Sequence, residues 1–106
     1  MATPNYMAGL FDAFAYETIA IATAAATAFT AATFITATGT AKRAVVTVED
    51  ASVRYRIDGG TPVTTTGAGH VLNANDVVVV TGRDNLSAFK AISVSSAASL
   101  RVTYEK

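Results

Sequence analysis

The chain has 106 residues, no cysteine and a formal net charge of zero, with 51% apolar and 15% charged residues. This length suits one domain with one core, and the composition is unlike that of a disordered protein. The lack of cysteine excludes disulfides, thiolate nucleophiles and cysteine zinc sites. Because the net charge is zero, nothing attracts the chain to nucleic acid or anionic lipid, and we expect neither as a partner.

The first 40 residues carry only two charges, Asp12 and Glu17. Within a single domain we therefore distinguish an Ala/Thr-rich segment, 1–40, from a β-sandwich body, 41–106; the segment forms either an arm or the first strands. A start without basic residues does not resemble a signal peptide, so we expect synthesis in the cytoplasm.

Large apolar groups crowd the beginning of the chain, where order is usually lost, so they need a partner surface. That surface is either the core or a neighbouring subunit. A short helix over residues 5–14 is one local structure that would present them. The candidates for subunit contact in this segment are Tyr6, Phe11, Phe14 and Tyr16.

Residues 18–41 contain no charge and are long enough to cross a bilayer. They consist mostly of Ala and Thr, which are close to neutral for membrane insertion. We therefore expect this stretch to pack inside a β domain or between subunits, with no membrane as a partner. Residues 17–23 alternate as a strand does, and the Thr content favours a strand over residues 24–36, with a break near 38–40.

Two alternating runs joined by a short polar link, residues 44–49 and 52–58, predict a β-hairpin. In the second run, Tyr55 and Ile57 share one strand face and are expected in the core. Residues 58–60, Asp-Gly-Gly, then predict a tight turn.

The C-terminal part predicts further short strands separated by turns. Residues 77–80 are all valine, so we expect both faces of that strand to be covered. Phe89 and Ile92 break the period of two, and a bulge near Lys90 or Ala91 would resolve the conflict. The remaining expected strands are residues 70–72, 87–94 and 100–104, with turns at 73–76 and 82–85.

Seven to eight short strands with closely spaced turns predict an all-β fold, an antiparallel β-sandwich of the jelly-roll or Greek-key kind. Few residues of the sequence could take part in catalysis or metal binding. His70 is the only His, and catalysis by a general base also needs an orienting partner and a nucleophile, so we interpret it as structural. A calcium site built on Glu49 and Asp50 would lack the usual spacing of oxygen ligands. We expect no enzyme activity, no catalytic residue, no cofactor and no metal.

Arg54 and Arg56 lie on one face of a single predicted strand, about 7 Å apart by strand rise. One interpretation pairs them with Glu49 or Glu105 across the sheet. The other makes them charged contacts to a neighbouring subunit, where Arg is favoured over Lys. Both interpretations stay open, and both residues join the candidates for subunit contact.

Strand ends and turns follow one another in a characteristic order over residues 40–106. They are 41–44 (AKRA), 53–59 (VRYRIDG), 61–62 (TP), 69–72 (GHVL), Asp76, Gly82, 85–86 (NL), 89–92 (FKAI) and 100–104 (LRVTY). This order resembles small structural proteins encoded among the head genes of tailed bacteriophages. The resemblance is a pattern of turns and strand ends, and no functional residue is carried over from it.

The resemblance implies a virion component, made in the host cytoplasm, that contacts further copies of itself and major capsid or other virion proteins. A capsid decoration (cement) protein is the first interpretation, and a head–tail or tail component is the alternative. A carbohydrate-binding β-sandwich module is a further hypothesis, against which the absence of Trp counts.

Overall fold

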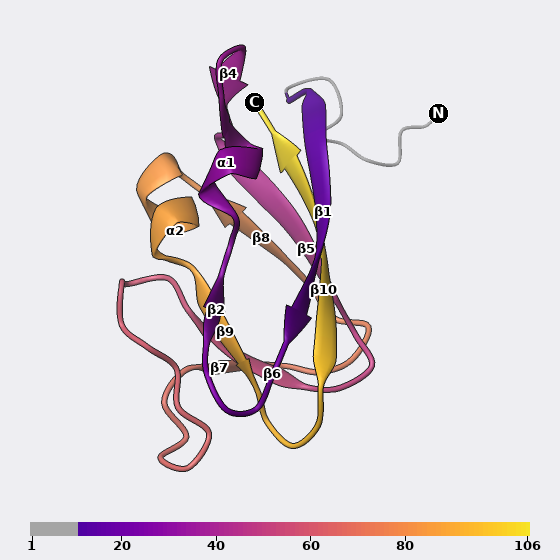
Figure 1. The fold of residues 1–106 in the computed structure, drawn as a ribbon, viewed down its shortest axis with the longest axis vertical. Helices are drawn as coiled ribbons and strands as arrows, with labels where there is room; N and C mark the ends of the chain where they lie inside the picture. Colours follow the sequence, from indigo (N-terminus) through magenta and orange to yellow (C-terminus); the bar gives the residue numbers. More distant parts are fainter. Residues whose placement is uncertain (1–10) are drawn as a thin grey trace.

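The computed structural model describes residues 11–106, which form an antiparallel β-sandwich (Figure 1). The strands are β1 (Ala13–Ile21), β2 (Thr27–Ala28), β3 (Ile35–Thr36), β4 (Gly39–Thr40), β5 (Arg43–Glu49), β6 (Val53–Arg56), β7 (His70–Leu72), β8 (Val77–Thr81), β9 (Lys90–Ser93) and β10 (Ala98–Glu105). The helices are α1 (Ala31–Phe34) and α2 (Arg83–Ala88).

Two four-stranded sheets make the sandwich. Sheet A has the order β1-β10-β5-β8 and sheet B the order β2-β9-β6-β7, while β3 and β4 form a separate two-stranded ladder. The predicted all-β, antiparallel sandwich is confirmed, with ten strands in residues 11–106 instead of seven to eight. β1 pairs with β10 and β2 pairs with β9, so the Ala/Thr-rich segment supplies an edge strand to each sheet.

The core lies between the sheets and is filled by side chains that alternate along the strands. Leu100, Val102 and Tyr104 of β10 are all fully buried, so one face of the strand predicted over residues 100–104 lies in the core. The rings of Phe29 and Phe89 stack with their centroids 4.1 Å apart, and Tyr104 meets Phe29 edge-on at 5.6 Å. Aromatic rings at these separations add to the stabilisation that burial itself provides.

Side-chain hydrogen bonds, one of them buried, join elements that are distant in the chain. The Ser93 hydroxyl, fully buried on β9, donates to the carbonyl of Ile21 on β1 at 2.8 Å. The Tyr104 hydroxyl donates to the carboxylate of Glu17, which also accepts from the Thr30 N–H at 3.2 Å. Burial, and next the bond to Glu17, raise the pKa of Tyr104 above its ordinary value.

The predicted hairpin of residues 44–49 and 52–58 is wrong. β5 belongs to sheet A and β6 to sheet B, so the link at 50–52 carries the chain from one sheet to the other. Val48 and Val53, on either side of this link, are both fully buried between the sheets. Alternation revealed which face of each run is buried, but it carries no information on which sheet the run joins.

The strand predicted over residues 24–36 is interrupted. α1 occupies Ala31–Phe34, and only Thr27–Ala28 and Ile35–Thr36 are extended. This break brings both Phe29 and Phe34 into the core, which a single straight strand face could not do because their spacing is odd.

The second helix replaces a predicted turn and part of a predicted strand. α2 begins after Gly82, whose φ of 104° suits glycine, and ends before Phe89. Phe89 and Ala91 are fully buried in the core, and Ile92, which is also buried, lies on the opposite face of β9 beside Arg54 of β6. Both faces of β9 are thus apolar here. The expected bulge near Lys90 or Ala91 is wrong, because β9 pairs with β6 without a register shift.

The helix considered for residues 5–14 is not present at its C-terminal end, because β1 already begins at Ala13. Residues 5–10 of that helix lie outside the described residues. Neither helix in residues 11–106 has the length and apolar character needed to cross a membrane.

Candidate interaction surface

The face of sheet A that points away from the core joins apolar and polar side chains in rows across all four strands. One row runs through Tyr16, Thr103, Val45 and Val79, as the register of the three strand pairs shows. The next row runs through Thr18, Arg101, Thr47 and Val77. We call these eight side chains the outer face of sheet A.

β8 forms an edge of this face. Among residues 11–106 it pairs only with β5. Val77 and Val79 are 57% and 47% exposed, whereas Val80 is buried. The prediction that both faces of the valine run are covered is therefore wrong, because no element within residues 11–106 covers the outer face of this edge strand.

A polar cluster lies near the middle of the outer face of sheet A. Arg101 donates to the Glu49 carboxylate at 3.2 Å and approaches the hydroxyls of Tyr16 and Thr18 at 3.4 Å each. The Thr18 hydroxyl and, next, Arg101 lower the pKa of Tyr16 below its ordinary value. Tyr16, one of the predicted contact residues, is 56% exposed and thus available to a second protein.

The other aromatic candidates near the start of the chain lie against cations of this same chain. The guanidinium of Arg43 lies 4.1 Å from the ring centroid of Phe11. The ammonium of Lys106 lies 5.1 Å from that of Phe14, which also packs against the core. These are cation–π distances. Tyr6 lies outside the described residues.

The cross-sheet pairing considered for Arg54 and Arg56 is wrong. Both carboxylates, Glu49 and Glu105, pair with arginines of sheet A itself. The two arginines of β6 instead bond to groups that follow them in the chain.

Arg54 holds the loop that connects β6 to β7. Its Nη1 donates to the carbonyl oxygens of Gly67 and Gly69 at 3.1 and 3.0 Å. Gly69 has a φ of 116°, and a Cβ there would lie 3.0 Å from the Tyr55 carbonyl oxygen. The loop therefore lies close against β6, and glycine is the residue that allows this approach.

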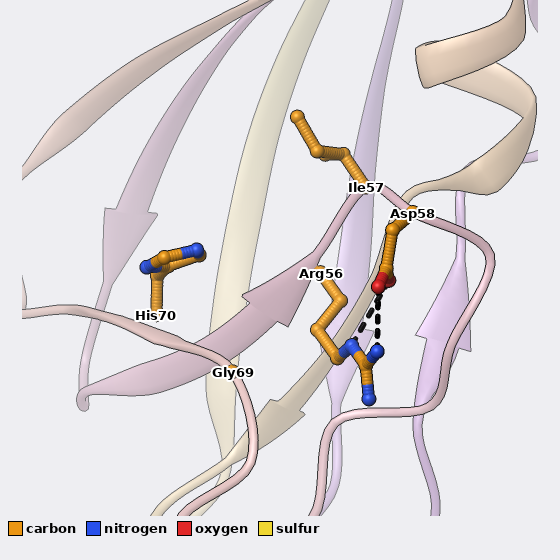
Figure 2. Close-up of a pocket in the computed structure, with 5 residues that line it drawn as sticks. All are labelled: Arg56, Ile57, Asp58, Gly69 and His70. Atoms are coloured by element: carbon orange, nitrogen blue, oxygen red, sulfur yellow. Dashed lines mark hydrogen bonds and ion pairs between the residues drawn. The ribbon is translucent and has the colours of Figure 1, made fainter.

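Arg56 and Asp58 form an ion pair that closes the turn after β6 (Figure 2). Two hydrogen bonds, 2.9 and 2.6 Å long, join the guanidinium to the carboxylate, which also accepts the Gly60 N–H at 3.0 Å. The bonds from Arg56, and next that from Gly60, lower the pKa of Asp58 from 3.8 to about 2. This confirms the predicted turn and assigns Arg56 a partner in its own chain.

A shallow, open pocket of about 340 Å³ lies beside this pair and is lined by Arg56, Ile57, Asp58, Gly69 and His70. In Figure 2 the guanidinium of Arg56 turns toward Asp58 and not toward His70. Ile57 is 37% exposed, so its predicted place in the core is wrong, because β6 ends at Arg56. The carboxylate of Asp58 already neutralises the only arginine in this pocket, which leaves little charge to bind a ligand.

Within residues 11–106, no three His, Asp or Glu side chains lie together as metal ligands. No family model, curated protein or solved structure matches the chain. The resemblance to phage head proteins therefore stays a prediction, and the exposed face and edge of sheet A are the best-defined candidate for a functional surface.

Proposed function

We propose that this protein is a non-enzymatic structural protein of a virion, most simply a capsid decoration protein that stabilises the shell through subunit contacts. The observation that carries the proposal is the outer face of sheet A, an array of Tyr, Val and Thr side chains with one Arg on four paired strands. Exposed apolar groups gathered on one side of a protein are typical of an interaction surface.

The composition supports the same function. A neutral, lightly charged protein associates readily with its neighbours, which is useful in a repeating assembly. A standard protein contact buries about 1,600 Å² in total, and weaker contacts combine when many copies attach to one shell. The partners in this proposal are further copies of the chain and a major capsid or other virion protein.

The charge arrangement favours a protein partner. Arg101, the arginine of the outer face, is paired with Glu49 at 3.2 Å, so the face presents no unpaired cation to a phosphate backbone. An array of apolar and hydroxyl groups around one neutralised pair suits a protein surface of similar character.

Shells that lack the protein provide the test. The gene is deleted from the phage, and purified protein is added back to the resulting particles. We expect saturable binding and a higher temperature of shell disruption. Thr103→Glu, at the centre of the outer face of sheet A, should weaken binding at least tenfold, because it places an unpaired charge in the contact.

Thr65→Glu is the matched control, since Thr65 is exposed on the loop between β6 and β7, outside sheet A. It should bind as the wild type does. Failure of the wild-type protein to bind shells would contradict the proposal, and equal binding by the two variants would exclude this face as the contact.

A further inference from the structure

The edge strand β8 lacks the features that usually prevent edge strands from pairing with another chain. Charged side chains, proline and bulges are the common protective devices. Val77–Thr81 contains no charge and no proline, and its register with β5 runs without interruption from Thr47–Val77 to Arg43–Thr81. All five residues are β-branched and suit an extended conformation.

The two ends of β8 differ in charge. Asp76 immediately precedes the strand. Asp50 lies near the same end, because the backbone of Val48, two residues before Asp50, bonds to the backbone of Asn75 and Asp76. At the other end, the carbonyl of Lys42 accepts the N–H of Gly82, and Arg83 follows. Near β8, the exposed charges without a salt-bridge partner in residues 11–106 are thus Asp50 and Asp76 at the start and, at the end, Lys42 and Arg83 with one acid, Asp84. The Glu49–Arg101 ion pair also lies toward the start.

We propose that β8 pairs with β8 of a second copy of this chain, antiparallel, about a two-fold axis that passes near Val79. A two-fold axis perpendicular to the strands makes self-pairing strands antiparallel and brings the same surface of each copy into the contact. In this arrangement the acidic start of each strand lies beside the basic end of its partner. A parallel arrangement would instead place like charges together.

The register follows from the alternation of faces. Residues that oppose each other across a pair must lie on the same face of the sheet. Val79 opposite Val79 satisfies this rule and places Val77 opposite Thr81, so the two exposed Val79 side chains lie against each other and each Val77 lies beside a Thr81 of the other copy. The two copies of sheet A then form one continuous eight-stranded sheet.

This inference rests on the proposed function and deepens it: one of the partners is a second copy of the chain, and the edge that binds it is β8. Five residues a side form a contact smaller than a standard interface, so association should depend on protein concentration. We therefore expect sedimentation equilibrium at low salt to show a monomer–dimer equilibrium that weakens as salt screens the charged ends.

Val79→Lys tests the edge directly. It places two ammonium groups opposite each other at the axis and should raise the dissociation constant at least tenfold. Val94→Lys is the matched control, the same substitution at an exposed valine in the link from β9 to β10. It should behave as the wild type does. A wild-type monomer at every concentration, or a dimer that Val79→Lys leaves unchanged, would overturn the proposal.

A cross-link provides a second test if Val79→Lys fails to fold. The chain contains no cysteine, so Val79→Cys introduces a single thiol. Directly opposed residues have Cα atoms about 4.5–5.5 Å apart, within the range that a disulfide spans. Mild oxidation should therefore link Val79→Cys into dimers much faster than Val94→Cys. Equal rates for the two variants would contradict the register.

The experiments can refute the virion function and the β8 pairing independently of each other. Shell binding by a protein that stays monomeric would overturn the β8 pairing alone. A β8-dependent dimer that never binds shells would overturn the virion function alone.

Discussion

Arg54 and Arg56 share a strand face, yet each binds a different part of the loop between β6 and β7. Arg54 bonds to the carbonyls of Gly67 and Gly69, near the end of the loop. Arg56 bonds to Asp58, at its beginning. The alternation of residues 53–56 predicted their common face, but it could not show these partners, because the loop folds back through glycines with positive φ.

We expect Arg54→Met to loosen the loop while the sandwich stays folded. The loss of two hydrogen bonds from a charged donor should cost about 1–3 kcal/mol. Hydrogen exchange should become faster at residues 67–69 and stay unchanged in β10. Arg56→Met is the control and should affect the turn at Asp58 only; faster exchange at residues 67–69 in both variants would contradict the assignment.

Asp58 should titrate well below an ordinary aspartate. Its pKa is lowered from 3.8 to about 2 in the folded protein. The unfolded chain therefore binds more protons between these values, and stability falls with falling pH. The stabilisation from Asp58 is complete above about pH 4 and is lost as the pH falls through about 2. Carboxyl NMR should show this midpoint, and Arg56→Gln should raise it; an ordinary midpoint in the wild type would exclude the ion pair.

Tyr104 should make the protein sensitive to alkali. Its pKa is raised in the folded state, whereas an unfolded tyrosine ionises near pH 10. The stabilisation from Tyr104 is therefore complete below pH 10 and is lost as the pH rises above it. Tyr104→Phe should cost about 1–3 kcal/mol at neutral pH, because Glu17 loses a donor, and should reduce the alkaline loss. Urea unfolding at neutral pH and above pH 10 measures the free energy of unfolding of both proteins. An equal loss of stability above pH 10 in the wild type and in Tyr104→Phe would contradict this role of Tyr104.

At the scale of the elements, the sequence predicted strands better than their partners. β10 was predicted as a strand from its alternation, and Leu100, Val102 and Tyr104, which share one of its faces, are buried. β5 and β6 were predicted as strands but not as members of different sheets. α2 was missed because its six residues are too few to show a helical period.

The candidate surface was only partly predictable. Residues 77–80 were predicted as a strand, but their composition suggested that both faces of the strand are covered. Exposure of Val77 and Val79 depends on β8 lying at the edge of sheet A, which local sequence does not specify. Tyr16 was a contact candidate from its position in the chain, and it does lie on the outer face of sheet A.

The Ser93 hydroxyl links β9 to the end of β1, next to the backbone bond from the Ser93 N–H to the carbonyl of Ala22, and should be important for joining the sheets. Ser93→Ala removes the buried bond to the carbonyl of Ile21 and leaves that acceptor without its partner. We expect a loss of about 1–3 kcal/mol in the free energy of unfolding, measured with denaturant. Ser96→Ala, at an exposed serine, should change it by less than about 0.5 kcal/mol. Similar losses in the two variants would show that the bond contributes little.

For the whole molecule, the arrangement is a sandwich whose core is closed between two sheets while one edge and one outer face of sheet A are open to solvent. Strong strand pairing keeps that face in place, since β10 pairs along its length with both β1 and β5. A rigid face of this kind can make the same contact many times with little loss of conformational freedom, as a shell requires.

The number of copies in a particle tests the virion function most directly. Particles purified by density gradient from cells that carry the gene are digested and quantified by mass spectrometry against labelled peptides of this protein and of the major capsid protein. The decoration role predicts a fixed ratio of the two proteins, with this chain nearly as abundant as the capsid protein. A few copies per particle would contradict decoration in favour of a head–tail or tail role, and absence from particles would contradict the virion function.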